Sequence, residues 1–402
     1  MMRVLQICNK APYPPNDGSS IAIYNMAEGF IANDTSLHLL TINTKKHFKE
    51  DKNIPENFRK QTHYRSVFRN TDVNAMGAIF NLFSSDSYFV SRFYFQEFEQ
   101  AIIDTLQKNE FDIIQLEGLF VAGYIPAIRK FSKAKIVLRA HNIEYLIWER
   151  HLKNEKSVLK KMYLNIQTQR LKAFELKVLN EVDAIVTITD VDKDYFKELG
   201  CKKPIYTCIT GVNVALYKEK SSTNNKQNTL FHFASMDWMP NVEAVDWLLE
   251  NCWKKIHEQC PEAKLVLAGR YMPEKFLKMN LPNVQVIEKV QDSGKFYKEN
   301  GIMLVPLLSG SGLRIKLIEG MAYGKAIVST SIGAEGIKYT TGKNILIADT
   351  PDQFVKAVVS ILKDETLKQN LEREAQQFSE NEFDNKKVVS GLIKFYTEIK
   401  NV

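Results

Sequence analysis

The chain has 402 residues, more than the roughly 250–300 that one hydrophobic core accommodates, so two domains are expected. Its composition, 45% hydrophobic and 25% charged, is typical of a folded globular protein and excludes extensive disorder. The net charge of +7 suits an enzyme that binds phosphorylated ligands or touches an anionic membrane, or a solvated basic surface without a partner. It is too small for a nucleic-acid-binding protein.

The cysteines and the apolar runs bear on cellular location. Five widely spaced cysteines without a CxxC pair indicate neither a disulfide framework nor a zinc site. The N-terminal apolar run ends at Asn9, too early for a signal peptide, and no segment reaches the roughly 20 apolar residues of a membrane-spanning helix. We therefore expect a cytoplasmic protein whose membrane contact, if it has one, is peripheral on the cytoplasmic face.

Short apolar runs alternate with longer helical patterns along the chain, as in parallel sheets with crossover helices. Two doubly wound, Rossmann-like α/β domains are therefore expected. The predicted strands of the first half are Val4–Cys8, Leu37–Ile42, Asp112–Leu116, Lys135–Arg139, Ala184–Ile188 and Pro204–Ile209, and those of the second half are Leu230–Ala234, Lys264–Ala268, Val284–Ile287, Ile302–Val305, Ala326–Ser329 and Ile345–Ile347.

A polar stretch without apolar periodicity, Tyr217–Asn228, predicts the interdomain linker. It places an N-terminal domain at residues 1–216 and a C-terminal domain at 217–385. The amphipathic pattern of Lys386–Ile399 predicts a final helix, and we expect residues 386–402 to join the N-terminal domain.

Two segments of the first half allow alternative interpretations. Aromatic residues are dense in Ala75–Phe98. This favours a packed helical core over an exposed edge that contacts lipid or an acceptor substrate. A long helix with five cations is predicted at Lys156–Leu179, and such charges are typical of a solvated face.

The most informative segment follows the strand Ile302–Val305, where a loop of small residues leads into a helix. Such a loop presents backbone N–H groups and the positive helix end at the carboxyl edge of the sheet, which suits a diphosphate. By itself such a loop is a weak signal, and a structural turn is the default interpretation. The loop contains Gly310, Ser311, Gly312 and Leu313.

Three charged side chains give this loop its functional interpretation. Arg314 and Lys316 fall in the first helical turn, where cations oppose the helix dipole unless an anion compensates, so they indicate a phosphate ligand. Glu319 is carried back toward the loop on the Lys316 side of the helix, where a carboxylate can accept hydrogen bonds from two ribose hydroxyls.

Polar residues also follow predicted strands of the first half. Gly18 comes after a proline-rich loop, and a glycine there lets a ligand approach the start of a helix, although a plain loop fits as well. His141 follows the strand Lys135–Arg139 and is either a structural hydrogen-bonding residue or a ligand contact. Glu117, Asn142 and Glu144 are candidates for acceptor contacts.

The segment Gly310–Gly324 resembles the donor-binding signature of the retaining GT-B glycosyltransferases of glycosyltransferase family 4. The resemblance extends to Phe231–Asn241, Leu265–Arg270 and Ala326–Gly336, covers nearly all of residues 230–350, and reaches more loosely into the first half. It implies two Rossmann-like domains that face each other across a cleft. It also implies transfer of a sugar, with retention, from a nucleoside-diphosphate sugar to a glycan, lipid-linked or small-molecule acceptor in polysaccharide or glycolipid synthesis.

The resemblance assigns the nucleotide ribose to Glu319 and the transferred sugar, near its reacting carbon, to His141. Backbone groups around Val290 are expected to select the nucleotide base. One departure is Ser311, which stands where the family often has a glutamate that contacts the transferred sugar. Another is the absence of Arg and Lys from Ser235–Asn241, where many relatives have a phosphate-binding cation.

The expected chemistry is departure of a nucleoside diphosphate, whose charge Arg314, Lys316 and the Gly310–Leu313 backbone would stabilise. Developing positive charge on the sugar would be met by the leaving diphosphate and by the His141 carbonyl. The sequence Asp190-Val191-Asp192 is interpreted as a helix-capping turn rather than a metal clamp. A metal-independent reaction is expected, with no cofactor besides the nucleotide-sugar co-substrate.

Three other functions fit parts of the sequence. A sugar-nucleotide epimerase shares the two-domain fold but needs acid and base carboxylates around the sugar. A dinucleotide-binding oxidoreductase needs a Gly-x-Gly-x-x-Gly turn after a strand, which neither glycine-containing loop supplies. A non-catalytic nucleotide-sugar-binding scaffold would account for Ser311 in place of the glutamate.

Overall fold

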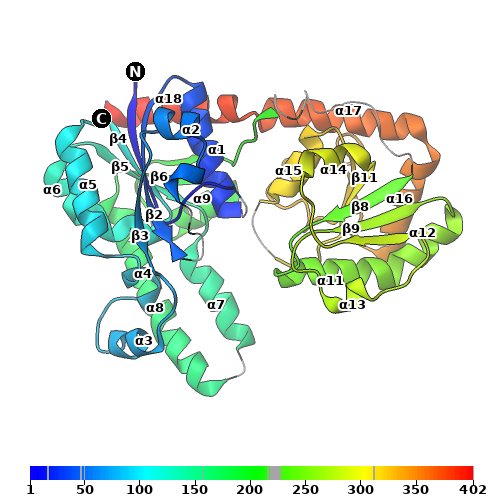
Figure 1. The fold of residues 1–402 in the computed structure, drawn as a ribbon, viewed down its shortest axis with the longest axis horizontal. Helices are drawn as coiled ribbons and strands as arrows, with labels where there is room; N and C mark the ends of the chain where they lie inside the picture. Colours follow the sequence, from blue (N-terminus) through cyan, green and yellow to red (C-terminus); the bar gives the residue numbers. More distant parts are fainter. Residues whose placement is uncertain are drawn as a thin grey trace. The chain divides into compact units, whose positions relative to one another are not determined.

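The computed structural model describes residues 1–15, 18–45, 48, 50–155, 157–214, 217, 228–310 and 313–401. The chain divides into two compact units, Met1–Gly211 with Asn385–Val402, and Val212–Asp384. Each unit is built on one sheet of parallel strands (Figure 1), which confirms the predicted fold class. The predicted boundary at residues 216 and 217 stays a prediction, because most of the linker segment lies outside the described residues.

The sheet of the first unit has the strand order β3-β2-β1-β4-β5-β6-β7. The order reverses between β1 and β4, so this is the topological switch point at which α/β sheets bind ligands. The strands are β1 (Arg3–Cys8), β2 (Ser36–Thr44), β3 (Arg65–Arg69), β4 (Ile113–Glu117), β5 (Lys135–Ala140), β6 (Ala184–Thr187) and β7 (Ile205–Thr207).

Alternate residues of β1 feed two core layers, one on each face of this sheet. Leu5 and Ile7 pack into one layer, and Val4 and Cys8 into the other. The α-helices are α1 (Gly18–Ala32), α2 (Glu56–Gln61), α3 (Ala75–Asn81), α4 (Tyr88–Ser91), α5 (Gln96–Lys108), α6 (Ile125–Phe131), α7 (Glu144–Asn154), α8 (Val158–Glu181), α9 (Asp190–Glu198) and α18 (Asn385–Lys400).

The sheet of the second unit has the order β10-β9-β8-β11-β12-β13, with its switch point between β8 and β11. The strands are β8 (Thr229–Phe233), β9 (Lys264–Ala268), β10 (Val284–Ile287), β11 (Ile302–Val305), β12 (Ala326–Ser329) and β13 (Leu346–Ile347). The helices are α11 (Met239–Leu248), a π-helical turn at Leu249–Trp253, α12 (Lys254–Gln259), α13 (Glu274–Leu277), α14 (Ser293–Glu299), α15 (Ile315–Ala322), α16 (Pro351–Lys363) and α17 (Glu365–Glu382).

Two expectations for the first unit need correction. The strand β3 was not predicted, because it is an edge strand whose residues are exposed or half-buried and therefore lacks an apolar run. The segment Ala75–Phe98 is not one packed core: Phe89 and Phe98 are buried, whereas α3 has no buried residue. None of the described helices is long and apolar enough to cross a membrane.

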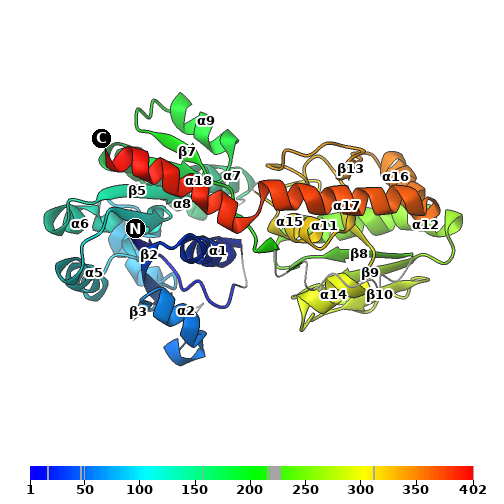
Figure 2. The same cartoon turned by 90° about the horizontal axis from the view of Figure 1, so that it is seen from above.

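The helix α18 lies beside α1 in both views (Figures 1 and 2) and contributes Val389, Leu392 and Tyr396 to the core of the first unit. Gly29 of α1 allows this close approach. A Cβ at that position would lie 2.3 Å from Val389 Cγ2 and 2.9 Å from its Cβ. The close packing of α1 against α18 therefore requires a residue without a side chain at position 29.

We predict that Gly29→Ala destabilises the first unit by about 1–3 kcal/mol, because α18 has to shift to admit a methyl group. Gly123→Ala is a matched control, since a Cβ there meets a Tyr94 ring atom at an ordinary 3.5 Å. Urea denaturation of the two variants measures the difference. Equal midpoints for both variants would show that the α1–α18 packing tolerates a side chain.

Candidate functional site

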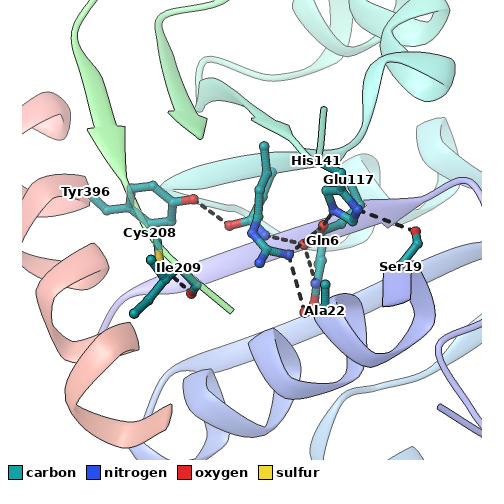
Figure 3. A network of polar contacts seen from close by, with 10 residues as sticks. Gln6, Ser19, Ala22, Glu117, His141, Cys208, Ile209 and Tyr396 are labelled. Atoms are coloured by element: carbon teal, nitrogen blue, oxygen red, sulfur yellow. Dashed lines mark hydrogen bonds and ion pairs between the residues drawn. The ribbon is translucent and has the colours of Figure 1, made fainter. Parts of the chain in front are cut away.

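A buried polar network lies at the carboxyl edge of β1, β4 and β5, beside the switch point of the first sheet (Figure 3). At its centre is Glu117, the last residue of β4, whose side chain has no exposed surface. One carboxylate oxygen accepts hydrogen bonds from the amides of Gln6, at 2.6 Å, and Gln115. The other lies 3.0 Å from Arg139 Nη1 and 2.6 Å from His141 Nε2.

Strand register assembles this network from separate parts of the sequence. Glu117 stands opposite Cys8 on one neighbouring strand and opposite Arg139 on the other. The final helix also takes part, because the Tyr396 hydroxyl donates to the Gln115 side-chain oxygen. Arg139 is fully buried, and its Nε and Nη2 have no hydrogen-bond partner among the described residues. Glu117 is therefore the anion that compensates a buried cation.

The protonation states of the network follow from these contacts. Burial alone would raise the pKa of the Glu117 carboxyl, but Arg139 and the hydrogen bond from His141 outweigh it and hold the pKa at about 2. Burial lowers the pKa of His141 below its usual value, an effect that Glu117 only partly offsets. Near neutral pH the pair is therefore a carboxylate and a neutral imidazole.

A neutral imidazole beside a carboxylate has one allowed tautomer. Because the Glu117 carboxylate only accepts hydrogen bonds, His141 Nε2 carries the proton and Nδ1 keeps a lone pair. Nδ1 lies 3.4 Å from the hydroxyl oxygen of Ser19, in the first turn of α1. The network thus presents a hydrogen-bond acceptor of fixed orientation at the start of α1.

The structure corrects the role predicted for Glu117. A side chain with no exposed surface, held by four donors, does not contact an acceptor directly, and Glu117 instead positions His141. Asn142 is exposed on the same loop. Glu144 begins α7, where Glu175 accepts hydrogen bonds from the backbone N–H groups of Glu144 and Tyr145. Burial and the nearby Glu175 raise the pKa of Glu144 to about 8, so its carboxyl is largely protonated at neutral pH.

In the second unit, the loop between β11 and α15 lies beside the switch point. Gly310 has a φ of +104°, and a Cβ there would lie 2.6 Å from the Trp238 ring, so a side chain is excluded. The guanidinium carbon of Arg314 lies 5.0 Å from the centroid of the same ring. Trp238 lies in the loop after β8. Its ring thus packs against both Gly310 of the β11–α15 loop and the guanidinium group of Arg314.

The second cation has an internal partner. Lys316 Nζ lies 2.9 Å from a Glu319 carboxylate oxygen and 4.6 Å from the centroid of the Phe233 ring. The hydroxyl of Tyr217 also hydrogen-bonds to Glu319. Glu319 therefore already compensates the charge of Lys316. That Arg314 and Lys316 bind a ligand anion stays a prediction.

The remaining predicted residues lie in loops or at helix starts. Ser311 and Gly312 are outside the described residues, and Leu313 is a half-buried loop residue between them and α15. Val290 is half-buried in the loop after β10, at the carboxyl edge of its sheet. Gly18 opens α1, and a Cβ there would meet no atom within 4 Å.

The Asp190-Val191-Asp192 segment opens α9. The Thr189 side chain accepts a hydrogen bond from the backbone N–H of Asp192, the arrangement of a helix N-cap. Within the described parts of the chain, no group of three His, Cys, Asp or Glu side chains is arranged to hold a metal ion.

Two models of known protein families match the chain, one in each half, in agreement with the two-unit architecture. The family model described as Glycosyltransferase Family 4 matches residues 16–216, half of the chain, and that described as Glycosyl transferases group 1 matches residues 227–364. The chain belongs to glycosyltransferase family 4. It is a glycosyltransferase with two Rossmann-like domains of the GT-B fold.

Similar proteins span the whole chain. A 44.6 kDa protein in the cps region of Klebsiella pneumoniae is 22% identical over 98% of this chain and 100% of its own. Sucrose-phosphate synthase from Thermosynechococcus elongatus has a TM-score of 0.69 at 13% identity, covering 99% of both chains. HepE from Anabaena, solved with UDP-glucose, has a TM-score of 0.64 at 12% identity and covers 99% of this chain and 100% of its own. At these identities the structures show a shared fold.

The sequence patterns do not identify several residues that take part in the two candidate sites. Gln6, Gln115 and Arg139 each interrupt an apolar strand, and that interruption was a usable signal for a buried polar network. Ser19 and Trp238 carry no such signal, because only the packing of α1 and of the β8 loop brings them to the sites.

We predict that Glu117→Gln destabilises the first unit by about 3–5 kcal/mol, because it leaves the buried Arg139 cation without its anion. Glu110→Gln is a matched control: Glu110 also pairs with an arginine, Arg3, at 3.1 Å, but its side chain is 87% exposed. Urea denaturation compares the two. The assignment fails if both variants unfold at the same denaturant concentration.

From the low pKa of the Glu117 carboxyl we predict that the stability of the first unit decreases in acid. Its pKa is about 2 in the folded chain, below the ordinary 4.5, so its stabilising contribution is complete above pH 4.5 and is lost as the pH falls toward 2. The free energy of unfolding of the wild type should therefore fall more steeply over this range than that of Glu117→Gln. Parallel pH profiles would contradict the prediction.

Proposed function

We propose that the chain is a retaining hexosyltransferase that moves a sugar from a nucleoside-diphosphate sugar to a glycan or lipid-linked acceptor without a metal ion. The observation that carries the proposal is the turn at the start of α15, where Arg314, Lys316 and Glu319 gather at the switch point of the second sheet. The solved complexes of HepE with UDP and with UDP-glucose support a donor of this class.

The ion pair between Lys316 and Glu319 suggests how the donor is bound. We propose that the diphosphate takes Lys316 and Arg314 as its cations, and that the released Glu319 carboxylate accepts hydrogen bonds from the ribose hydroxyls. Lys316 then exchanges the Glu319 carboxylate for a phosphate, and Glu319 exchanges the ammonium group for hydroxyl donors, so both keep polar partners when the donor binds. As the bond from the sugar carbon to the diphosphate breaks, the two cations stabilise the departing oxygen.

In the first unit, we propose that His141 contacts the transferred sugar. Its Nδ1 is the acceptor that Glu117 fixes in place, and it suits a sugar hydroxyl. Its backbone carbonyl would face positive charge that develops at the reacting carbon. Asn142 and the protonated Glu144 would offer hydrogen-bond donors to the acceptor sugar.

The biological setting is proposed from the relatives. The Klebsiella pneumoniae protein lies in a cps region, which supports a role in polysaccharide synthesis. Nucleoside-diphosphate sugars as donors support a cytoplasmic location. A sugar-nucleotide epimerase is the competing function, and analysis of the products formed from donor alone distinguishes the two, because an epimerase needs no acceptor.

We predict that Arg314→Ala and Lys316→Ala each lower turnover roughly 10²–10³-fold, as expected for loss of a group that stabilises the leaving phosphate. Glu319→Ala should weaken binding of the matching nucleoside diphosphate in a panel of UDP, GDP, ADP and dTDP, measured by calorimetry. Lys295→Ala and Glu299→Ala, which remove an exposed pair in α14, are the controls. Wild-type affinity and turnover in all three site variants would remove the phosphate and ribose assignments.

We predict that His141→Ala lowers the transfer rate while leaving the affinity for the nucleoside diphosphate unchanged, because the imidazole contacts the sugar and not the nucleotide. His151→Ala, an exposed residue of α7, is the control. Steady-state rates and calorimetry on the same preparations separate the two effects. A large loss of nucleotide affinity in His141→Ala would move this residue to the nucleotide.

A further inference from the structure

Exposed apolar side chains are concentrated in one part of the first unit. Of the 23 large hydrophobic residues that the described chain leaves exposed, eleven lie in the two short segments 68–83 and 158–166. We call these side chains the α3/α8 surface. The most exposed are Val73 (69%), Phe80 (72%), Phe83 (89%), Val158 (72%) and Leu159 (81%).

The two segments are tied together by polar contacts on their inner sides. Gln167 of α8, fully buried, donates to the Asn81 side chain at 2.9 Å and accepts from the backbone N–H of Tyr88 at 2.7 Å. Arg170 donates to the backbone carbonyls of Asn81 and Leu82 at 2.9 and 3.0 Å. Figure 1 shows α3 beside α8.

These contacts fix the orientation of α3. Gly77 lets the helix approach the Tyr88 ring, since a Cβ there would lie 2.9 Å from the hydroxyl oxygen. The Tyr88 hydroxyl in turn donates to the Asn74 carbonyl at 3.3 Å. The side of α3 that faces the unit is therefore made of small residues and Asn81, which anchors it. Its large apolar residues, Met76, Ile79 and Phe80, are exposed, the reverse of an ordinary surface helix.

The charges around this surface are predominantly positive. Residues 158–174 of α8 hold four cations, Lys160, Lys161, Arg170 and Lys172, and no carboxylate. Two of these cations pair with carboxylates, Lys160 with Glu155 at 2.6 Å and Lys172 with Glu149 at 3.4 Å. The nearby Asp72 pairs with Lys45 at 3.1 Å. Within the described residues, Lys161 has no carboxylate within ion-pair distance.

We propose that the α3/α8 surface docks the enzyme on an anionic lipid bilayer. Phe80, Phe83 and Leu159 would enter the boundary between headgroups and acyl chains, while Lys160 and Lys161 would lie at the level of the lipid phosphates. The combination of outward apolar residues and excess positive charge matches a bilayer of anionic lipids. The inference rests on this surface alone, so it can hold or fail independently of the proposed transfer reaction.

Sedimentation of the full chain with vesicles tests the proposal. The wild type should bind vesicles of phosphatidylcholine and phosphatidylglycerol at least tenfold more tightly than phosphatidylcholine alone, and added salt should weaken this binding. Phe80→Ser/Phe83→Ser and Lys160→Glu/Lys161→Glu should each reduce the binding at least tenfold. Thermal melting checks that these exposed changes leave the fold intact.

Matched controls come from the same unit. Val191→Ser removes an apolar side chain of α9 that is 71% exposed, and Lys202→Glu/Lys203→Glu reverses another adjacent lysine pair; both should bind like the wild type. Failure of the wild type to sediment with anionic vesicles would overturn the proposal. So would self-association of the wild type, without vesicle binding, that Phe80→Ser/Phe83→Ser abolishes, because it would assign the surface to a second copy of the chain.

Discussion

The candidate site of the first unit depends on the buried carboxylate of Glu117, which holds both Arg139 and His141. A cation and an anion are both withdrawn from water at this point, and each is stable there only because the other is present. Removing these two charges from water has an unfavourable desolvation free energy, which a pair of apolar side chains would not have. What the buried pair provides is a histidine that remains neutral at physiological pH and has only one tautomer, with the lone pair on the nitrogen that lies beside Ser19.

The second unit uses charge in a different way. Arg139 and Glu117 are both fully buried, whereas Lys316 and Glu319 form an i,i+3 pair in which the lysine is 40% exposed. A pair of this kind holds both side chains near the start of α15 and can still be exchanged for ligand contacts. One unit thus has a permanent charge pair that orients a neutral group, and the other has a replaceable pair suited to a charged ligand.

The sequence predicted the framework well because its strands are short apolar runs separated by long helices. It also indicates His141, Arg314, Lys316 and Glu319 as candidate site residues, since each follows a predicted strand at the edge where parallel sheets bind ligands, and their roles stay predictions. Which of these residues touch each other depends on strand register and on helix packing, which no local pattern encodes. For that reason the sequence pattern predicts a substrate contact for Glu117, whereas the strand register buries its side chain.

Aromatic density was a poorer guide. In Ala75–Phe98 the same residue type is used in opposite ways, since Phe98 is buried and Phe83 is 89% exposed. The distinction is made by Gln167 and Arg170, which lie more than 80 positions later in the chain and bind the polar inner side of the α3 segment. A single-sequence interpretation has no access to such partners.

The topology of the first unit connects the α3/α8 surface with the candidate site. In a parallel sheet all carboxyl ends lie at one edge, so the segment that leads from β3 to α3 starts at the same edge as the loop that carries His141. The helix α7 leaves from this loop, and α8 returns alongside it to β6, which brings the start of α8 beyond the sheet on that side (Figure 1). The outward apolar surface and the fixed imidazole therefore belong to one side of the unit. A lipid-linked acceptor would need that arrangement, because its sugar has to reach the site while its lipid remains in the bilayer.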